Sequence, residues 1–232
     1  MDIIKTIKDH MVPVHPAGYP FVLAFGFGAI LLFQVWDPLG WLGVILTGWC
    51  AFFFRDPPRV VPTMKGVVVS PADGVVVSTG QTEPPEELGL KGKHNRISIF
   101  LNIFDVHVNR VPATGQVDSV CYTAGEFLNA ELDKASEKNE RMAIAMTTED
   151  ETKIGFVQIA GLVARRIVCE LGEGQKVEVG ERFGLIRFGS RVDVYLPEKV
   201  KPQVALGQRV IAGESILARL SGQQRKYDVA EK

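Results

Sequence analysis

Residues 19–54 contain only one Asp, Glu, Lys, Arg or His, which is Asp37. Asp37 lies in the motif WDPLG, a turn signal that divides this stretch into apolar segments 19–36 and 39–54. Each segment is close to the minimum of about 17 residues that a helix needs to cross a bilayer. We therefore expect a helical hairpin that spans or dips into a membrane. The alternative is a hairpin buried inside a soluble protein.

Charges on both sides of the hairpin favour one orientation. Lys5, Lys8, Arg55, Arg59 and Lys65 flank the apolar segments, and positive flanks tend to stay in the cytoplasm. Both hairpin ends then lie on the cytoplasmic face of the cell membrane, together with the rest of the chain. A signal peptide fits poorly, because the apolar run is too long and starts late. The expected domains are a flanking segment 1–18, a membrane-associated hairpin 19–54 and a catalytic domain 55–232.

After the proline-rich motif RDPPRVVP (55–62), the pattern changes to short alternating segments broken by Gly, Pro and Asp. The connections are too short for helical crossovers, so we expect a mainly β (α+β) fold with an antiparallel β domain. One segment, NAELDKASEKNERMA (129–143), is a short helix or a surface excursion.

An internal repeat refines this expectation. The segments 174–186 and 207–219 share the pattern G-Q-[K/R]-V-x-x-G-E, which indicates a strand, a turn with glycine at positive φ, and a second strand. Such hairpins resemble the barrel-sandwich domains of biotinyl and lipoyl carriers. No lysine motif of the kind that carries the prosthetic group occurs at a matching place, so the likeness is architectural.

Composition excludes several classes of function. The net charge of −1 and the lack of a Lys/Arg run give no basis for binding nucleic acid. The three cysteines include no CxxC pair, so they predict neither a disulfide framework nor a zinc site, and no metal is expected.

Three residues combine reactive side chains with apolar surroundings: Asp73 in the turn SPADG, His107 in the alternating segment FDVHVNR, and Ser190 in GLIRFGSRVDVYLP. Asp, His and Ser suggest a hydrolase triad, but the G-x-S-x-G turn between strand and helix is missing. Gly189 permits another reaction. A serine hydroxyl can attack the preceding carbonyl where the backbone is strained, and glycine has no Cβ to obstruct that attack.

Several stretches, covering about residues 12–218, together resemble the short, bacterial, membrane-associated phosphatidylserine decarboxylases: YPF…FFFRDPPR, VVSPADGVV, FLNIFDVHVNRVP, GEFLNAELDKASEKNER, VQIAGLVARRIVC and GERFGLIRFGSRVDVYLP. The resemblance implies a proenzyme (zymogen) that cleaves itself between Gly189 and Ser190. The products are a large chain, 1–189, and a small chain, 190–232, which stay associated. Ser190 becomes a pyruvoyl group, which forms a Schiff base with phosphatidylserine. This lyase then releases carbon dioxide and phosphatidylethanolamine, a step of phospholipid biosynthesis.

The resemblance also implies roles for individual residues. Ser190 is the nucleophile and pyruvoyl precursor, Gly189 is its cleavage partner, Asp73 matches the triad aspartate, and His107 matches the D-x-H histidine. Longer relatives have a second histidine where this chain has Arg110. Either His107 therefore serves both maturation and decarboxylation, or another group deprotonates Ser190.

Guanidinium groups match phosphate oxygens, so five arginines are candidates for the lipid headgroup: Arg110, Arg165, Arg166, Arg187 and Arg191.

Two competing hypotheses stay open. One is a membrane-tethered serine hydrolase that uses Ser190, His107 and Asp73 without self-cleavage. The other is a non-catalytic barrel module. Exposed apolar surface and sheet edges also predict a homodimer.

Overall fold

The computed structural model describes residues 12–125, 138–161, 166–187 and 189–220. The chain divides into two compact units, Met1–Pro58 and Arg59–Lys232, which are described separately below.

The first unit is helical. It contains η1 (Pro16–Gly18), α2 (Tyr19–Phe33) and α3 (Asp37–Phe53). The expected pair of apolar segments is confirmed, but Asp37 and Pro38 begin the second helix, whereas the sequence placed them in the turn. Proline fits the first turn of a helix, where its missing N–H is not needed. The two helices pack closely at small residues, because a Cβ on Gly43 would lie 2.8 Å from Cα of Ala29.

Large apolar side chains project outward from this helix pair. Leu23, Phe27 and Ile45 are each more than 60% exposed. Pro16–Phe33 is long and apolar enough to cross a membrane, with 11% of that window buried, while the second apolar helix, Asp37–Phe53, is shorter. The helices are therefore not the buried core that the soluble alternative requires.

The second unit is an antiparallel β structure, and its described residues include a short 3-10 helix, η2 (Glu86–Leu88). Its strands are β1 (Val67–Val69), β2 (Gly74–Thr82), β3 (His94–Leu101), β4 (Val108–Arg110), β5 (Gly115–Thr123), β6 (Arg141–Thr148), β7 (Lys153–Ile159), β8 (Ile167–Cys169), β9 (Lys176–Val177), β10 (Arg182–Ile186), β11 (Ser190–Pro197), β12 (Arg209–Val210) and β13 (Ile216–Arg219). The expected mainly β class is confirmed. The segment 129–143 lies mostly outside the described residues, and its described end enters β6.

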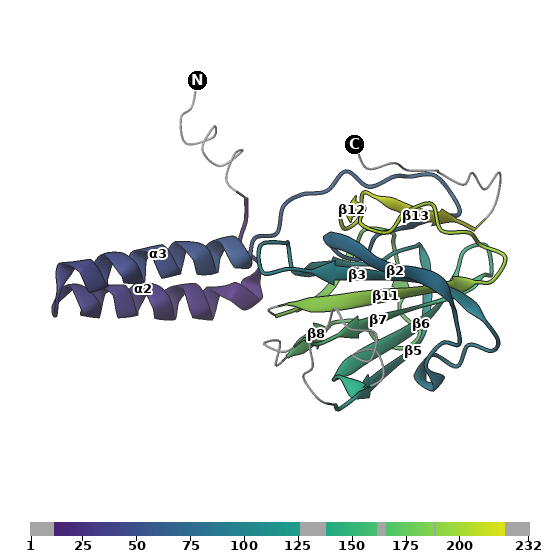
Figure 1. Ribbon diagram of the computed structural model, residues 1–232, viewed down its shortest axis with the longest axis horizontal. Helices are drawn as coiled ribbons and strands as arrows, with labels where there is room; N and C mark the ends of the chain where they lie inside the picture. Colours follow the sequence, from purple (N-terminus) through teal and green to yellow (C-terminus); the bar gives the residue numbers. More distant parts are fainter. Residues whose placement is uncertain (1–11, 126–137, 162–165, 188, 221–232) are drawn as a thin grey trace, which may run out of the picture. The chain divides into compact units, whose positions relative to one another are not determined.

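The strands form one large sheet and two small ones (Figure 1). The large sheet has eight strands in the order β12-β2-β3-β11-β7-β6-β5-β9, the second has the order β4-β10-β8, and β1 pairs with β13. Strand β11 lies between β3 and β7, so both of its edges are hydrogen-bonded.

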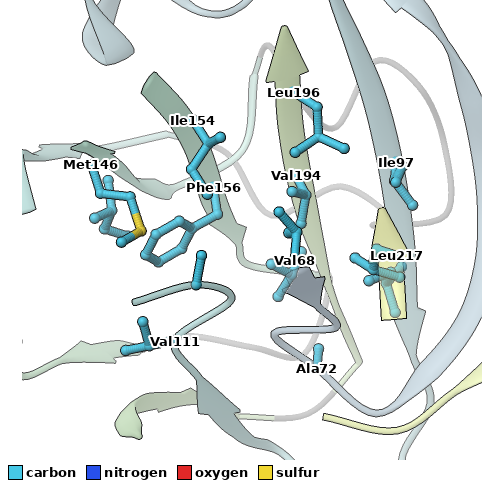
Figure 2. Packing of buried hydrophobic residues seen from close by; sticks show 14 of the residues in the cluster. Val68, Ala72, Ile97, Val111, Met146, Ile154, Phe156, Val194, Leu196 and Leu217 are labelled. Carbon is cyan, nitrogen blue, oxygen red and sulfur yellow. The ribbon is translucent and has the colours of Figure 1, made fainter. Parts of the chain in front are cut away.

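The core lies between these sheets. Figure 2 shows side chains from several strands meeting there, among them Phe156, Val194 and Leu217. Phe156 of the large sheet packs edge-on against Phe183 of the three-stranded sheet, with ring centroids 5.2 Å apart. Burying each such ring contributes about 1.5–3 kcal/mol, so the contact helps to hold the two sheets together.

The internal repeat contains the expected turns, but the two strands of each copy do not pair with each other as in a hairpin. Strands β9 and β10 lie in different sheets, and so do β12 and β13. Gly180 and Gly213, at equivalent places in the repeat, have φ of 80° and 77°. Gln175 and Gln208 each accept a hydrogen bond from a backbone N–H three residues earlier. The two copies therefore share their turn geometry as well as their sequence pattern.

Candidate active site

Two connections run side by side at one corner of the β unit. Residues 102–107 lead from β3 to β4, and residues 187–189 lead from β10 to β11. The first runs from the large sheet to the three-stranded sheet and the second runs back, because β3 pairs with β11 and β4 pairs with β10. They are joined at both ends, where Ser190 lies opposite Leu101 and the Ile186 N–H donates to the His107 carbonyl at 3.3 Å. Gly189 and Ser190 therefore lie on the connection next to the one that carries His107, although no hydrogen bond joins Ser190 Oγ to the His107 ring.

The peptide bond between Gly189 and Ser190 has features expected of a bond that the neighbouring serine hydroxyl attacks. Gly189 adopts a left-handed φ of 57°, and a Cβ there would find no atom within 4 Å. Ser190 is fully buried, and its Oγ has no hydrogen-bond partner among the described residues. Burying a polar group without a partner costs about 1–3 kcal/mol, so this hydroxyl is retained at some expense to stability.

His107 is held in a defined tautomer. Its Nδ1 lies 2.9 Å from the carbonyl oxygen of Asp105. A carbonyl only accepts, so Nδ1 carries the hydrogen, and the lone pair of the neutral ring lies on Nε2. His107 is 2% exposed and Nε2 is buried. The ring is therefore prepared to accept a proton at Nε2.

The connection that carries His107 is rigidly folded. The Asp105 carboxylate accepts from the Asn102 N–H at 2.9 Å and pairs with Arg209. The Asn102 side chain accepts from the Phe104 N–H at 2.8 Å. Asp105 and Arg209 thus support the histidine. The sequence interpretation missed both, although the D-x-H motif already contains Asp105.

Asp73 lies near the same end of the large sheet, just before β2, whose Val75 pairs with Phe100 of β3. Both carboxylate oxygens accept from Arg59, at 2.9 and 2.8 Å, and one also accepts from the Ala212 N–H at 2.8 Å. These contacts of Asp73 with Arg59 and Ala212 are structural, and an interaction with His107 stays a prediction. Arg59 was not among the residues predicted from sequence.

Two of the five candidate arginines face the protein interior. Arg191 is fully buried and pairs with Asp193 through Nε at 2.6 Å and Nη2 at 2.8 Å. Arg110 is 6% exposed and donates to the Gly180 carbonyl at 2.9 Å. These contacts give both side chains a role in holding the fold.

Arg166 and Arg187 lie together beside the corner. The Arg187 N–H donates to the Arg166 carbonyl at 3.4 Å, and the Arg166 side chain is exposed. Burial lowers the pKa of Arg187, and the positive charge of Arg166 lowers it further. Arginine nevertheless stays charged at neutral pH. Two adjacent positive guanidinium groups favour the binding of an anion between them. Arg165 lies outside the described residues.

A buried amide pair escaped the sequence interpretation. Gln158 Nε2 donates to Asn109 Oδ1 at 2.8 Å, and both residues are fully buried. Asn109 Nδ2 and Gln158 Oε1 have no hydrogen-bond partner within the ranges that the structure describes. The available sequence signal was a polar residue inside each of two apolar strands, VNR and FVQIA.

A buried serine hydroxyl behind a left-handed glycine, at a corner shared with a histidine of fixed tautomer, defines a class of precursor proteins able to act on their own backbone. Comparison with known proteins makes this specific. The family model for phosphatidylserine decarboxylase matches residues 46–218. The chain belongs to the phosphatidylserine decarboxylase family.

Two relatives are similar over nearly their whole length. A phosphatidylserine decarboxylase proenzyme from Paramagnetospirillum magneticum is 56% identical over 218 residues, which cover 94% of this chain and 91% of the relative. Another, from Beijerinckia indica subsp. indica, is 52% identical over 219 residues, which cover 94% of each chain. The family resemblance predicted from the sequence motifs is confirmed.

Proposed function

We propose that this protein is a phosphatidylserine decarboxylase, made as a proenzyme that cleaves itself between Gly189 and Ser190. The observation that carries the site assignment is the complete burial of Ser190, with an unpartnered Oγ next to the Gly189 carbonyl. A hydrolase acting on an outside substrate needs an accessible hydroxyl. A buried hydroxyl instead favours attack on the neighbouring carbonyl of the same chain.

Each residue at the corner has a part in this cleavage. His107 Nε2 accepts the Ser190 hydroxyl proton while Nδ1 stays bonded to the Asp105 carbonyl. We propose that the left-handed φ of Gly189 helps its carbonyl carbon to meet Oγ. The Gly189 carbonyl carbon moves from nitrogen to oxygen, which gives an ester. Elimination then releases the Gly189 carboxylate and leaves dehydroalanine at position 190, and hydrolysis converts it into a pyruvoyl group with release of ammonia.

We expect the corner to accommodate a pyruvoyl group, because Ser190 Oγ, its precursor, has no hydrogen bond to lose among the described residues. Such a group supplies a ketone that accepts an amine and draws electrons as carbon dioxide leaves. We infer that Arg166 and Arg187 bind the anionic part of the lipid headgroup, with Arg165 as a further candidate. His107 is placed to return the proton after decarboxylation.

The test combines a denaturing gel, intact mass and carbon dioxide release. The wild-type protein should give chains 1–189 and 190–232, the smaller without a free amino terminus. Ser190→Ala should give one folded, uncleaved and inactive chain. Cleavage of Ser190→Ala would refute the mechanism, and an intact wild-type chain that reacts with a serine-directed phosphonate would support the hydrolase instead.

The role of Asp73 has its own test. If Asp73 assists His107, Asp73→Asn should slow cleavage more than Arg59→Met, although both break the same ion pair. Equal effects of the two variants would assign Asp73 to structure alone.

We infer further that the helical unit anchors the enzyme in the membrane as a hairpin, with both ends and the catalytic domain 55–232 in the cytoplasm. The outward apolar side chains of the helices support this proposal. A carboxy-terminal reporter that is active only in the cytoplasm tests the orientation, and inactivity of that reporter in an active, membrane-bound fusion would contradict it.

Two further predictions stay proposals. The equivalent turns in the two copies of the repeat support a carrier-like barrel-sandwich arrangement. Strands β12 and β9 form the two edges of the large sheet, and such open edges support a homodimer, which the mass of the detergent-solubilised enzyme tests.

A further inference from the structure

The buried amide pair Asn109–Gln158 bridges the two sheets at the corner that holds Ser190. Asn109 lies on β4, where it pairs with Gly184, and Gln158 lies on β7 of the large sheet. The hydrogen bond from Gln158 Nε2 to Asn109 Oδ1 fixes the plane of both amides. It leaves the Asn109 Nδ2 hydrogens without an acceptor among the described residues.

Strand register places this pair on the same side of the large sheet as Ser190. Gln158 is opposite Val192, and opposite residues in an antiparallel ladder project to the same face. Ser190 and Val192 are two residues apart on β11, so they too share a face. That face holds the main core, which includes Val192, Val194 and Leu196. The unpartnered Asn109 donor and the unpartnered Ser190 hydroxyl therefore lie in the same interior.

Self-cleavage creates a need for such a donor. When Oγ attacks the Gly189 carbonyl carbon, a C–O bond forms, the hydroxyl proton passes to His107 Nε2, and one C=O electron pair moves onto oxygen. That pair returns as the C–N bond breaks, and the proton moves to the leaving amine, so nothing is oxidised or reduced. A donor aimed at the transient oxyanion accelerates this type of step.

We propose that Asn109 is a catalytic residue of self-cleavage, whose Nδ2 donates a hydrogen bond to the oxyanion on Gly189, and that Gln158 is the residue that positions it. This inference rests on the proposed function and extends it. An unpartnered amide donor in a fully buried position is explained if the acceptor appears only during the reaction.

The experiment follows the conversion of newly made full-length chain into chains 1–189 and 190–232 during cell-free synthesis with lipid vesicles. Loss of one oxyanion donor typically costs about 10²–10³-fold in rate, and we expect that slowing for Asn109→Ala. Asn109→Asp keeps the shape but removes the donor, so it should be slowed at least as much at neutral pH. Gln158→Met should be slowed about tenfold, because Asn109 keeps its donor but loses its fixed plane.

Asn95→Ala is the matched control. Asn95 is also buried, but its Nδ2 is satisfied by the carbonyls of Glu198 and Val200. It lies near the opposite end of β3 from Leu101, about 20 Å away at roughly 3.3 Å per residue. We expect Asn95→Ala to lose stability while cleaving at nearly the wild-type rate. Melting temperatures are compared in the non-cleaving Ser190→Ala background.

The pH dependence separates a donor from a residue that only supports His107. In Asn109→Ala the cleavage rate should fall at every pH, with its inflection unchanged, because His107 still accepts the proton. A shifted inflection, near-normal cleavage of Asn109→Asp, or a larger effect from Gln158→Met than from Asn109→Ala would overturn the proposal. None of those results would contradict the proposed function. Cleavage of Ser190→Ala would contradict it.

Discussion

Gly189→Ala is the most informative single change at the cleavage site. Gly189 has a φ of 57°, and a Cβ there would meet no atom within 4 Å. The substitution therefore adds no clash, and its cost is the left-handed backbone penalty of a residue with a Cβ, about 1–2 kcal/mol. If cleavage requires this backbone geometry, the competent population should fall by about 5–30-fold.

The assay is the time course of chain cleavage, with stability measured in the Ser190→Ala precursor. Gly89→Ala is the control, because Gly89 has a φ of 61° and equally open space around its Cβ position. Both variants should lose similar stability, but only Gly189→Ala should cleave slowly. If Gly189→Ala cleaves at the wild-type rate, or if Gly89→Ala is slowed equally, positive φ at Gly189 has no part in the reaction.

Two further predictions concern ionised groups that take no direct part in the proposed cleavage. Burial raises the pKa of Glu87, but hydrogen bonds from the backbone and from Arg141 outweigh it and hold that pKa below the usual 4.5. Glu87→Gln should therefore have a lower melting temperature than wild type at pH 7. The difference in melting temperature should shrink as the pH falls below 4.5 and through the lowered pKa of Glu87. A difference that does not depend on pH would contradict this. Arg191→Met should cost about 3–5 kcal/mol because it leaves Asp193 charged and buried, and adding Asp193→Leu should recover most of that loss in urea unfolding. A double variant no more stable than the single one would refute this.

Local sequence signals predicted much of the architecture. Alternating apolar residues bounded by Gly, Pro and Asp located the strands, and the repeated G-Q-[K/R]-V-x-x-G-E pattern located the positive-φ glycines Gly180 and Gly213. The predicted start of the second helix was wrong, because WDPLG fits both a turn and a helix that begins with proline in its first turn. Neighbouring residues decide between the two.

The parts that the sequence did not reveal depend on contacts between distant residues. Asn109 and Gln158 meet only because strands from different sheets converge at one corner. Arg59 reaches Asp73 through the path of the chain before β1. Polar residues in apolar strands were visible in the sequence, but their partners were not.

Strand β11 begins at the proposed cleavage site and is hydrogen-bonded along both edges, so we expect the small chain to stay in the sheet after cleavage. Once the small chain has dissociated, no covalent bond holds it near the large chain. Refolding then requires the two chains to bind each other again from solution. We therefore expect the uncleaved precursor to refold after heating, whereas the stability of the cleaved enzyme depends on its rate of unfolding.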